Sequence, residues 1–132
     1  MKQSSILTIA SLLSILLLIF HLADDIVRGF EPGGISNLVA GVVITVIWLY
    51  GALVLAERRS GYIIMLLFSL ASLAVPIVHM KGKGVGVTSS LGHTSGHFFF
   101  VSTLLAVGTI GVFSIILAAH LLWRLPWRRT RS

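Results

Sequence analysis

The stretch QSSILTIASLLSILLLIFHLA (residues 3–23) contains no Asp, Glu, Lys or Arg, and residues 32–56, 60–80 and 84–123 share this property. A transmembrane helix needs about 20 mostly apolar residues to cross roughly 30 Å of hydrocarbon. The first three stretches each fit one crossing. The fourth begins with a segment rich in Gly, Ser and Thr (84–96), which is typical of a loop, and continues as a long apolar helix. We therefore predict four helices, near residues 5–28, 36–57, 61–80 and 96–124.

The composition of the whole chain supports the same class. Of its 132 residues, 56% are apolar and only 11% are charged, against roughly 25% charged in soluble domains. These charges are too few to cover the surface that a soluble domain of this size exposes. The net charge of +6 would suit nucleic acid, but four of the ten basic residues lie in the last nine positions. The prediction is a single integral membrane domain over 1–132, an all-α antiparallel bundle of four transmembrane helices with short loops and no nucleic-acid partner.

The basic residues predict the orientation of this bundle, because Lys and Arg concentrate on the cytoplasmic side of transmembrane helices. The side that holds both termini and the second loop carries seven of them: Lys2, Arg58, Arg59, Arg124, Arg128, Arg129 and Arg131. The other side carries three: Arg28, Lys81 and Lys83. Both termini are therefore expected in the cytoplasm, and a bacterial inner membrane is the expected location. The four C-terminal arginines (Arg124, Arg128, Arg129 and Arg131) are expected to contact lipid headgroups, at about 1 kcal/mol per residue near an anionic leaflet.

Absent residue types exclude several kinds of chemistry. The chain has no cysteine, which excludes thiolate nucleophiles, disulfide exchange, iron–sulfur clusters and cysteine-bound zinc. The first helix has no carboxylate before Asp24, whereas a small proton-coupled multidrug exporter needs one within the apolar part of that helix. The absence of cysteine therefore excludes four-helix thiol oxidoreductases, and the absence of that carboxylate disfavours a proton-coupled exporter.

Polar residues of the first helix follow one stripe. In hydrocarbon, polar side chains face protein or water because lipid tails offer them no hydrogen-bond partner. The stripe is therefore expected to face the interior of the bundle. Its members recur at steps of three, four or seven residues: Ser4, Thr8, Ser11, Leu18, His21, Asp25 and Arg28. Ser14 and Asp24 lie close beside this stripe.

The far end of that stripe, HLADDIVR (residues 21–28), is the main candidate site. His21 is three and four residues from the two aspartates, so helical spacing brings these side chains together and lets both carboxylates reach Arg28. An ion-pair network that ends the helix is the simplest interpretation. The same membrane face is expected to hold three more histidines, and imidazole with carboxylate is a ligand set for Zn, Cu(II), Ni or Fe(II). The candidate ligand or metal-binding residues are His21, Asp24, Asp25, Arg28, His79, His93 and His97.

Three functional hypotheses follow from these residues. The one we favour from sequence is a non-enzymatic accessory or self-associating membrane protein, with the cluster as a binding patch and the lipid bilayer, a second copy or a larger membrane complex as partner. The second is a redox or transport protein that binds a divalent metal, or a single haem held by His79 with His97 or His21. The third is an intramembrane acid–base enzyme acting on a lipid or quinone-like substrate. No catalytic residue is assigned.

Overall fold

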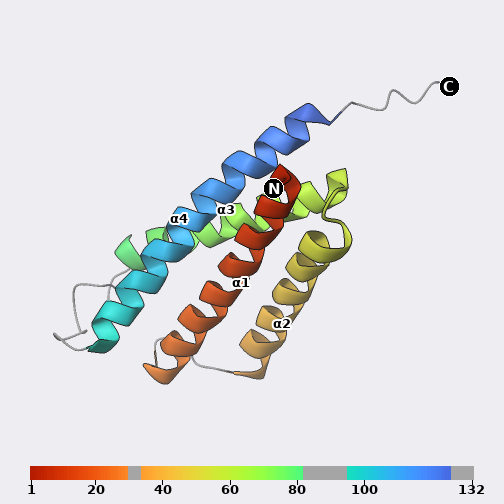
Figure 1. Cartoon of the computed structure of the whole chain (residues 1–132). Coiled ribbons are helices and arrows are strands. Elements are labelled where there is room, and N and C mark those ends of the chain that lie inside the picture. The colour runs from red at the N-terminus through yellow and green to blue at the C-terminus, as the bar shows by residue number, and fades with distance from the viewer. Residues whose placement is uncertain (30–33, 82–94, 126–132) are drawn as a thin grey trace.

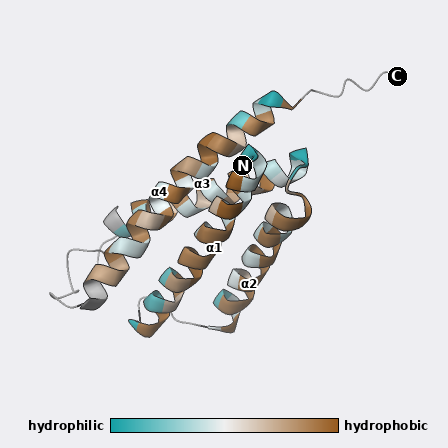
Figure 2. Cartoon of the chain, viewed as in Figure 1, coloured by the Kyte–Doolittle hydropathy of each residue, from teal (hydrophilic) through white to brown (hydrophobic). Residues whose placement is uncertain are grey.

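The computed structural model describes residues 1–29, 34–81 and 95–125, and this part of the chain is helical without any strand. The elements are α1 (Gln3–Val27), α2 (Ile35–Leu49), the π-helical turn η1 (Tyr50–Val54), α3 (Arg59–Lys81) and α4 (Ser95–Arg124) (Figure 1). Each of α1, α2 with η1, α3 and α4 is long and apolar enough to cross a membrane. The prediction of an all-α protein with four membrane-spanning helices is confirmed at this level. Figure 2 shows hydrophobic residues along all four helices, with hydrophilic residues gathered mainly toward their ends.

The helices pack to different extents. The most extensive pairing joins α3 to α4, and α1 packs mainly on α4, whereas α2 contacts its neighbours least. In the α2–η1 span, 17% of the most apolar window is buried, against 28–33% in the other three spans. The buried residue of α2 is Trp48, whose ring stacks on that of Phe68 at 5.4 Å between centroids. Buried aromatic rings contribute much of the packing energy of a core, so Trp48 is the main anchor of α2.

Two sets of contacts define the ends of the bundle. At one end, Lys2 pairs with Glu57 at 3.6 Å, which brings the start of α1 beside the turn between η1 and α3; we call this the turn end. At the other end, His21 of α1, His79 of α3 and Phe100 of α4 lie in contact with one another; we call this the site end. The residues of the site end are therefore close in space although they come from three helices.

The polar stripe of α1 faces the bundle, as predicted. Ser11 and Ser14 are fully buried, and Ser4 is nearly so. Thr8 donates a hydrogen bond of 3.2 Å to the backbone carbonyl of Ala52 in η1. Inside a membrane such interhelical hydrogen bonds and small side chains let helices approach closely.

The second span ends earlier, and less regularly, than the sequence indicates. It widens into η1 and finishes at Val54, short of the predicted end at residue 57. The turn that follows is tight, because Gly61 packs so closely on the carbonyl of Leu55 that a Cβ could not be accommodated. A π-helical turn is rare and is not encoded by hydrophobic periodicity, so the apolar run alone could not reveal it.

Candidate metal centre

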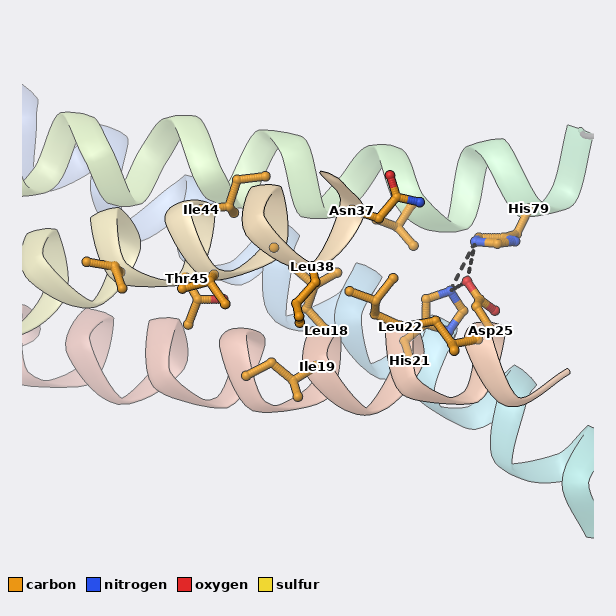
Figure 3. Close-up of a pocket in the computed structure, with 15 residues that line it drawn as sticks. Leu18, Ile19, His21, Leu22, Asp25, Asn37, Leu38, Ile44, Thr45 and His79 are labelled. Carbon is orange, nitrogen blue, oxygen red and sulfur yellow. Dashed lines mark hydrogen bonds and ion pairs between the residues drawn. The ribbon is translucent and has the colours of Figure 1, made fainter. Parts of the chain in front are cut away.

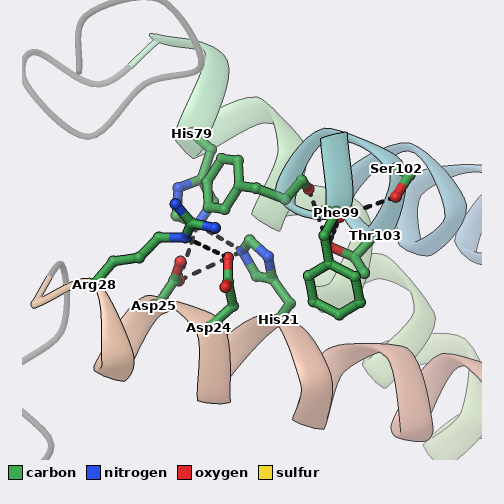
Figure 4. Close-up of polar contacts among 9 residues, drawn as sticks. His21, Asp24, Asp25, Arg28, His79, Phe99, Ser102 and Thr103 are labelled. Carbon is green, nitrogen blue, oxygen red and sulfur yellow. Dashed lines mark hydrogen bonds and ion pairs between the residues drawn. The ribbon is translucent and has the colours of Figure 1, made fainter. Parts of the chain in front are cut away.

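Two histidines and one aspartate meet at the site end with their ligating atoms facing one another. The Nε2 atoms of His21 and His79 are 3.0 Å apart. The Oδ2 atom of Asp25 lies 3.4 Å from His21 Nε2 and 3.6 Å from His79 Nε2. The three atoms thus form a compact triangle, and Figure 4 shows the three side chains pointing toward one another. Such a group of two imidazoles and one carboxylate could hold a metal ion.

Helix geometry explains how each side chain reaches this position. His21 and Asp25 are four residues apart in α1, so they lie one above the other on the same face. His79 comes from the last turns of α3, and Phe100 near the start of α4 packs against both imidazoles, with ring centroids 5.2 Å from His21 and 5.6 Å from His79. Phe100 is fully buried, so it excludes water from the α4 side of the triangle.

The triangle is buried as well as compact. The side chains of His21, Asp25 and His79 are 2%, 5% and 13% exposed. A carboxylate in such a place is costly unless it is paired, hydrogen-bonded or bound to a cation. The Nδ1 atom of His21 is also buried, and it has no hydrogen-bond partner among the described residues. Within the described residues, His21 therefore makes its two polar contacts, with His79 and with Asp25, through the same atom, Nε2.

The separations match those of ligands on one metal ion. At Zn–N and Zn–O bonds of about 2.0–2.2 Å, adjacent ligands of a tetrahedral ion lie about 3.3–3.5 Å apart. The observed edges of 3.0, 3.4 and 3.6 Å bracket that value. Without a metal, one imidazole Nε2 donates a hydrogen bond to the other at 3.0 Å, and the Asp25 oxygen lies within ion-pair distance of both.

The neighbouring pair of Asp24 and Arg28 lies beside this triangle. Arg28 Nε donates to Asp24 Oδ2 at 2.6 Å, and both side chains are partly exposed. The guanidinium carbon of Arg28 lies 5.9 Å from the centroid of Phe100, within range of a cation–π interaction. Asp24 is thus paired with Arg28, and the carboxylate of Asp25 faces the histidines.

The remaining predicted site residues are placed as follows. His93 lies outside the described residues, and His97 lies within α4 but its side chain is not among those described. Arg124 is exposed at the end of α4, while Arg128, Arg129 and Arg131 lie outside the described residues. Headgroup contact by these four arginines stays a prediction. Of the candidate ligands, the structure brings together His21, Asp25 and His79, with Asp24 and Arg28 as an adjacent pair.

A cavity of about 580 Å³ opens beside the triangle, between α1, α2 and the end of α3 (Figure 3). Its walls are mostly aliphatic, and its polar lining residues are His21, Asp25, His79, Asn37 and Thr45. Sequence reasoning missed the contribution of α2. Its signal is the spacing of Asn37, Gly41 and Thr45, which follow one another at intervals of four residues and so share one face of the helix.

Comparison of the chain with protein-family models, with curated proteins and with solved structures gave no match. The function is therefore argued from the geometry of this site.

Proposed function

We propose that this protein is a small four-helix membrane protein that binds one divalent transition-metal ion through His21, Asp25 and His79. The observation that carries the proposal is the triangle of Nε2, Nε2 and Oδ2 atoms with edges of 3.0, 3.4 and 3.6 Å. Those separations suit three ligands of a single ion.

Charge and burial favour this proposal over a simple ion-pair network. Asp25 is nearly inaccessible, and its Oδ2 atom lies 3.4 Å and 3.6 Å from the Nε2 atoms of His21 and His79. A buried carboxylate in an apolar setting is costly unless a cation or hydrogen bonds compensate it. A divalent ion would compensate the carboxylate and satisfy both imidazoles through the atoms that already converge.

The ligand set indicates which ions fit. Two imidazoles and one carboxylate suit Zn²⁺, or Fe²⁺ in its open facial arrangement. Three protein ligands leave at least one coordination position for water or another molecule. A haem held by His21 and His79 does not fit, because axial imidazole nitrogens on opposite faces lie roughly 4 Å apart, twice a metal–nitrogen bond of about 2 Å. The two nitrogens are 3.0 Å apart, and the rings meet at 89°.

The site end is proposed to face the outside of a bacterial inner membrane, with an antiparallel bundle and both termini inside. The turn end carries Lys2, Arg58 and Arg59 in the described part of the chain, and such residues favour the cytoplasmic side. Under this orientation the metal site lies near the outer surface of the membrane.

Cobalt titration of the chelator-treated protein in detergent tests the proposal. Co²⁺ bound to a nitrogen and oxygen site gives visible absorption, and the expected result is one ion per chain. His79→Ala should weaken binding at least tenfold. His120→Ala is the matched control, because His120 is exposed in α4 and far along the chain from the site. Absence of stoichiometric binding, or full binding in His79→Ala, would overturn the proposal.

A further inference from the structure

We propose that the cavity beside the triangle binds a single alkyl chain ending in a carboxylate. The carboxylate would coordinate the metal ion held by His21, Asp25 and His79. This inference rests on the proposed metal site and names the class of molecule that would complete it. The ligand is a free single-chain fatty acid taken from the bilayer.

The lining of the cavity is divided into a polar end and an apolar body. Figure 3 shows His21, Asp25 and His79 together at one end, with Ile44 and Thr45 toward the other. Between them the walls are aliphatic side chains of α1 and α2, together with Gly41. A volume of about 580 Å³ lies within the roughly 300–1,000 Å³ of small-ligand sites, which combine an apolar lining with a few placed polar groups. The division matches a molecule with one small headgroup and one chain.

The cavity lies where lipid can reach it. It sits between α1 and α2, and α2 is the least buried of the four spans. Several lining residues are also exposed at the surface of the bundle, among them Ile19, Leu38 and Val42. An apolar chain could therefore enter sideways from the hydrocarbon without crossing water.

Charge identifies the headgroup as an anion. Among the described residues around the triangle, a divalent ion with two neutral imidazoles and the carboxylate of Asp25 leaves one net positive charge, and the charges of Asp24 and Arg28 cancel in the sum. Net charge in an apolar setting is costly. A carboxylate on the open coordination position would cancel it, whereas an alcohol or a quinone carbonyl would not.

Co²⁺-loaded protein in a non-ionic detergent provides the test, with decanoate, acetate and decanol as probes. The expected result is that decanoate changes the visible absorption of Co²⁺ at a concentration at least tenfold lower than acetate. Decanol should leave the spectrum unchanged, because it has the chain without the anion.

Filling the cavity should remove the preference for decanoate over acetate, because the alkyl chain would no longer have a place to bind. A Cβ on Gly41 would meet Leu22 Cδ2 at 3.6 Å, an ordinary contact, so the backbone tolerates a side chain there and a larger one enters the cavity. Gly41→Phe, and the smaller Gly41→Leu should the first variant fail to fold, are expected to respond to decanoate and acetate alike while still binding Co²⁺. Val43→Phe is the control, because Val43 lies on the same helix, is exposed and does not line the cavity.

The outcomes separate the two proposals. Loss of the decanoate preference in a Gly41 variant that keeps Co²⁺, with Val43→Phe unaffected, supports the inference. Equal responses to decanoate and acetate in the unaltered protein, or a preference that survives in the folded Gly41 variant, overturn this inference and leave the metal site standing. Failure to bind Co²⁺ overturns the proposed function and this inference with it.

Discussion

Asp24 and Asp25 are neighbours in the sequence and differ in what they contact. Asp24 pairs with Arg28 at 2.6 Å, while Asp25 lies 3.4 Å and 3.6 Å from the two histidine nitrogens. Asp25→Asn is expected to lower metal affinity at least tenfold, about 1.4 kcal/mol, because it removes the anionic ligand. Asp24→Asn should change it far less. Competition with a chromophoric chelator measures the metal affinity of both variants. Equal losses of affinity in the two variants would contradict the assignment of Asp25 as the ligand.

Part of this site could be predicted from the sequence at the level of single residues. The spacing of four between His21 and Asp25 requires only helix geometry. The choice of Asp25 over Asp24 depends on where α3 lies, since adjacent residues point about 100° apart around a helix of 3.6 residues per turn. The contact of His79 with both residues depends on the packing of α3 against α1, which hydropathy does not encode. That is why, among the described side chains, the sequence could not separate the three residues that converge from the neighbouring Asp24 and Arg28.

At the scale of elements, the proposed ion would join two helices that otherwise touch little. Direct packing between α1 and α3 is slight compared with that of α3 on α4, and the triangle takes two ligands from α1 and one from α3. An ion that binds the folded state at 100 times its dissociation constant stabilises it by about 2.7 kcal/mol. Zn²⁺ should therefore raise the thermal unfolding midpoint of the detergent-solubilised protein.

The matched variant for that measurement is His79→Ala, which leaves α1 unchanged. Its midpoint should not respond to Zn²⁺, because the ligands left on α1 no longer connect it to α3. A rise as large as that of the unaltered protein would show that Zn²⁺ acts somewhere other than the triangle.

The contact between α3 and α4 depends on glycine. A Cβ on Gly111 would meet Ser72 Oγ at 3.0 Å and the carbonyl of Ser69 at 3.4 Å, whereas one on Gly41 meets Leu22 Cδ2 at 3.6 Å. Gly111→Val is expected to lower the free energy of unfolding by about 1–3 kcal/mol, the usual cost of overpacking. Gly41→Ala should be neutral or slightly stabilising, since alanine favours the helix by roughly 0.5–1 kcal/mol.

Denaturation of both glycine variants in mixed detergent, followed by circular dichroism, provides the comparison. Each change removes one glycine from a membrane-spanning helix, so helix propensity affects both in the same direction. Equal stability of Gly111→Val and Gly41→Ala would mean that α3 and α4 are not packed as closely as the structure has them.

The elements themselves were largely predictable, and their packing was not. Charge-free runs of about 20 residues define membrane spans because charged side chains are excluded from hydrocarbon. Within a span, lipid and protein interior are equally apolar, so α2 gives no sequence signal that distinguishes its single buried residue, Trp48, from its lipid-facing ones. Three of the four serines of α1 are the exception: the spacing of Ser4, Ser11 and Ser14 marks the buried face, whereas Ser5 is exposed.

At the scale of the whole molecule, the proposed orientation can be tested because the chain has no cysteine. Any single-cysteine variant therefore carries one thiol. Ser36 and Ser60 are both exposed, Ser36 at the start of α2 beside the cavity-lining Asn37, and Ser60 at the start of α3 by the turn end. In intact bacterial cells a maleimide that cannot cross the inner membrane should label Ser36→Cys, and should label Ser60→Cys only after lysis. The physical reason is the excess of basic residues at the turn end, which favours its retention in the cytoplasm. Labelling of Ser60→Cys alone would place the metal site on the cytoplasmic face, and the ion would then come from inside the cell.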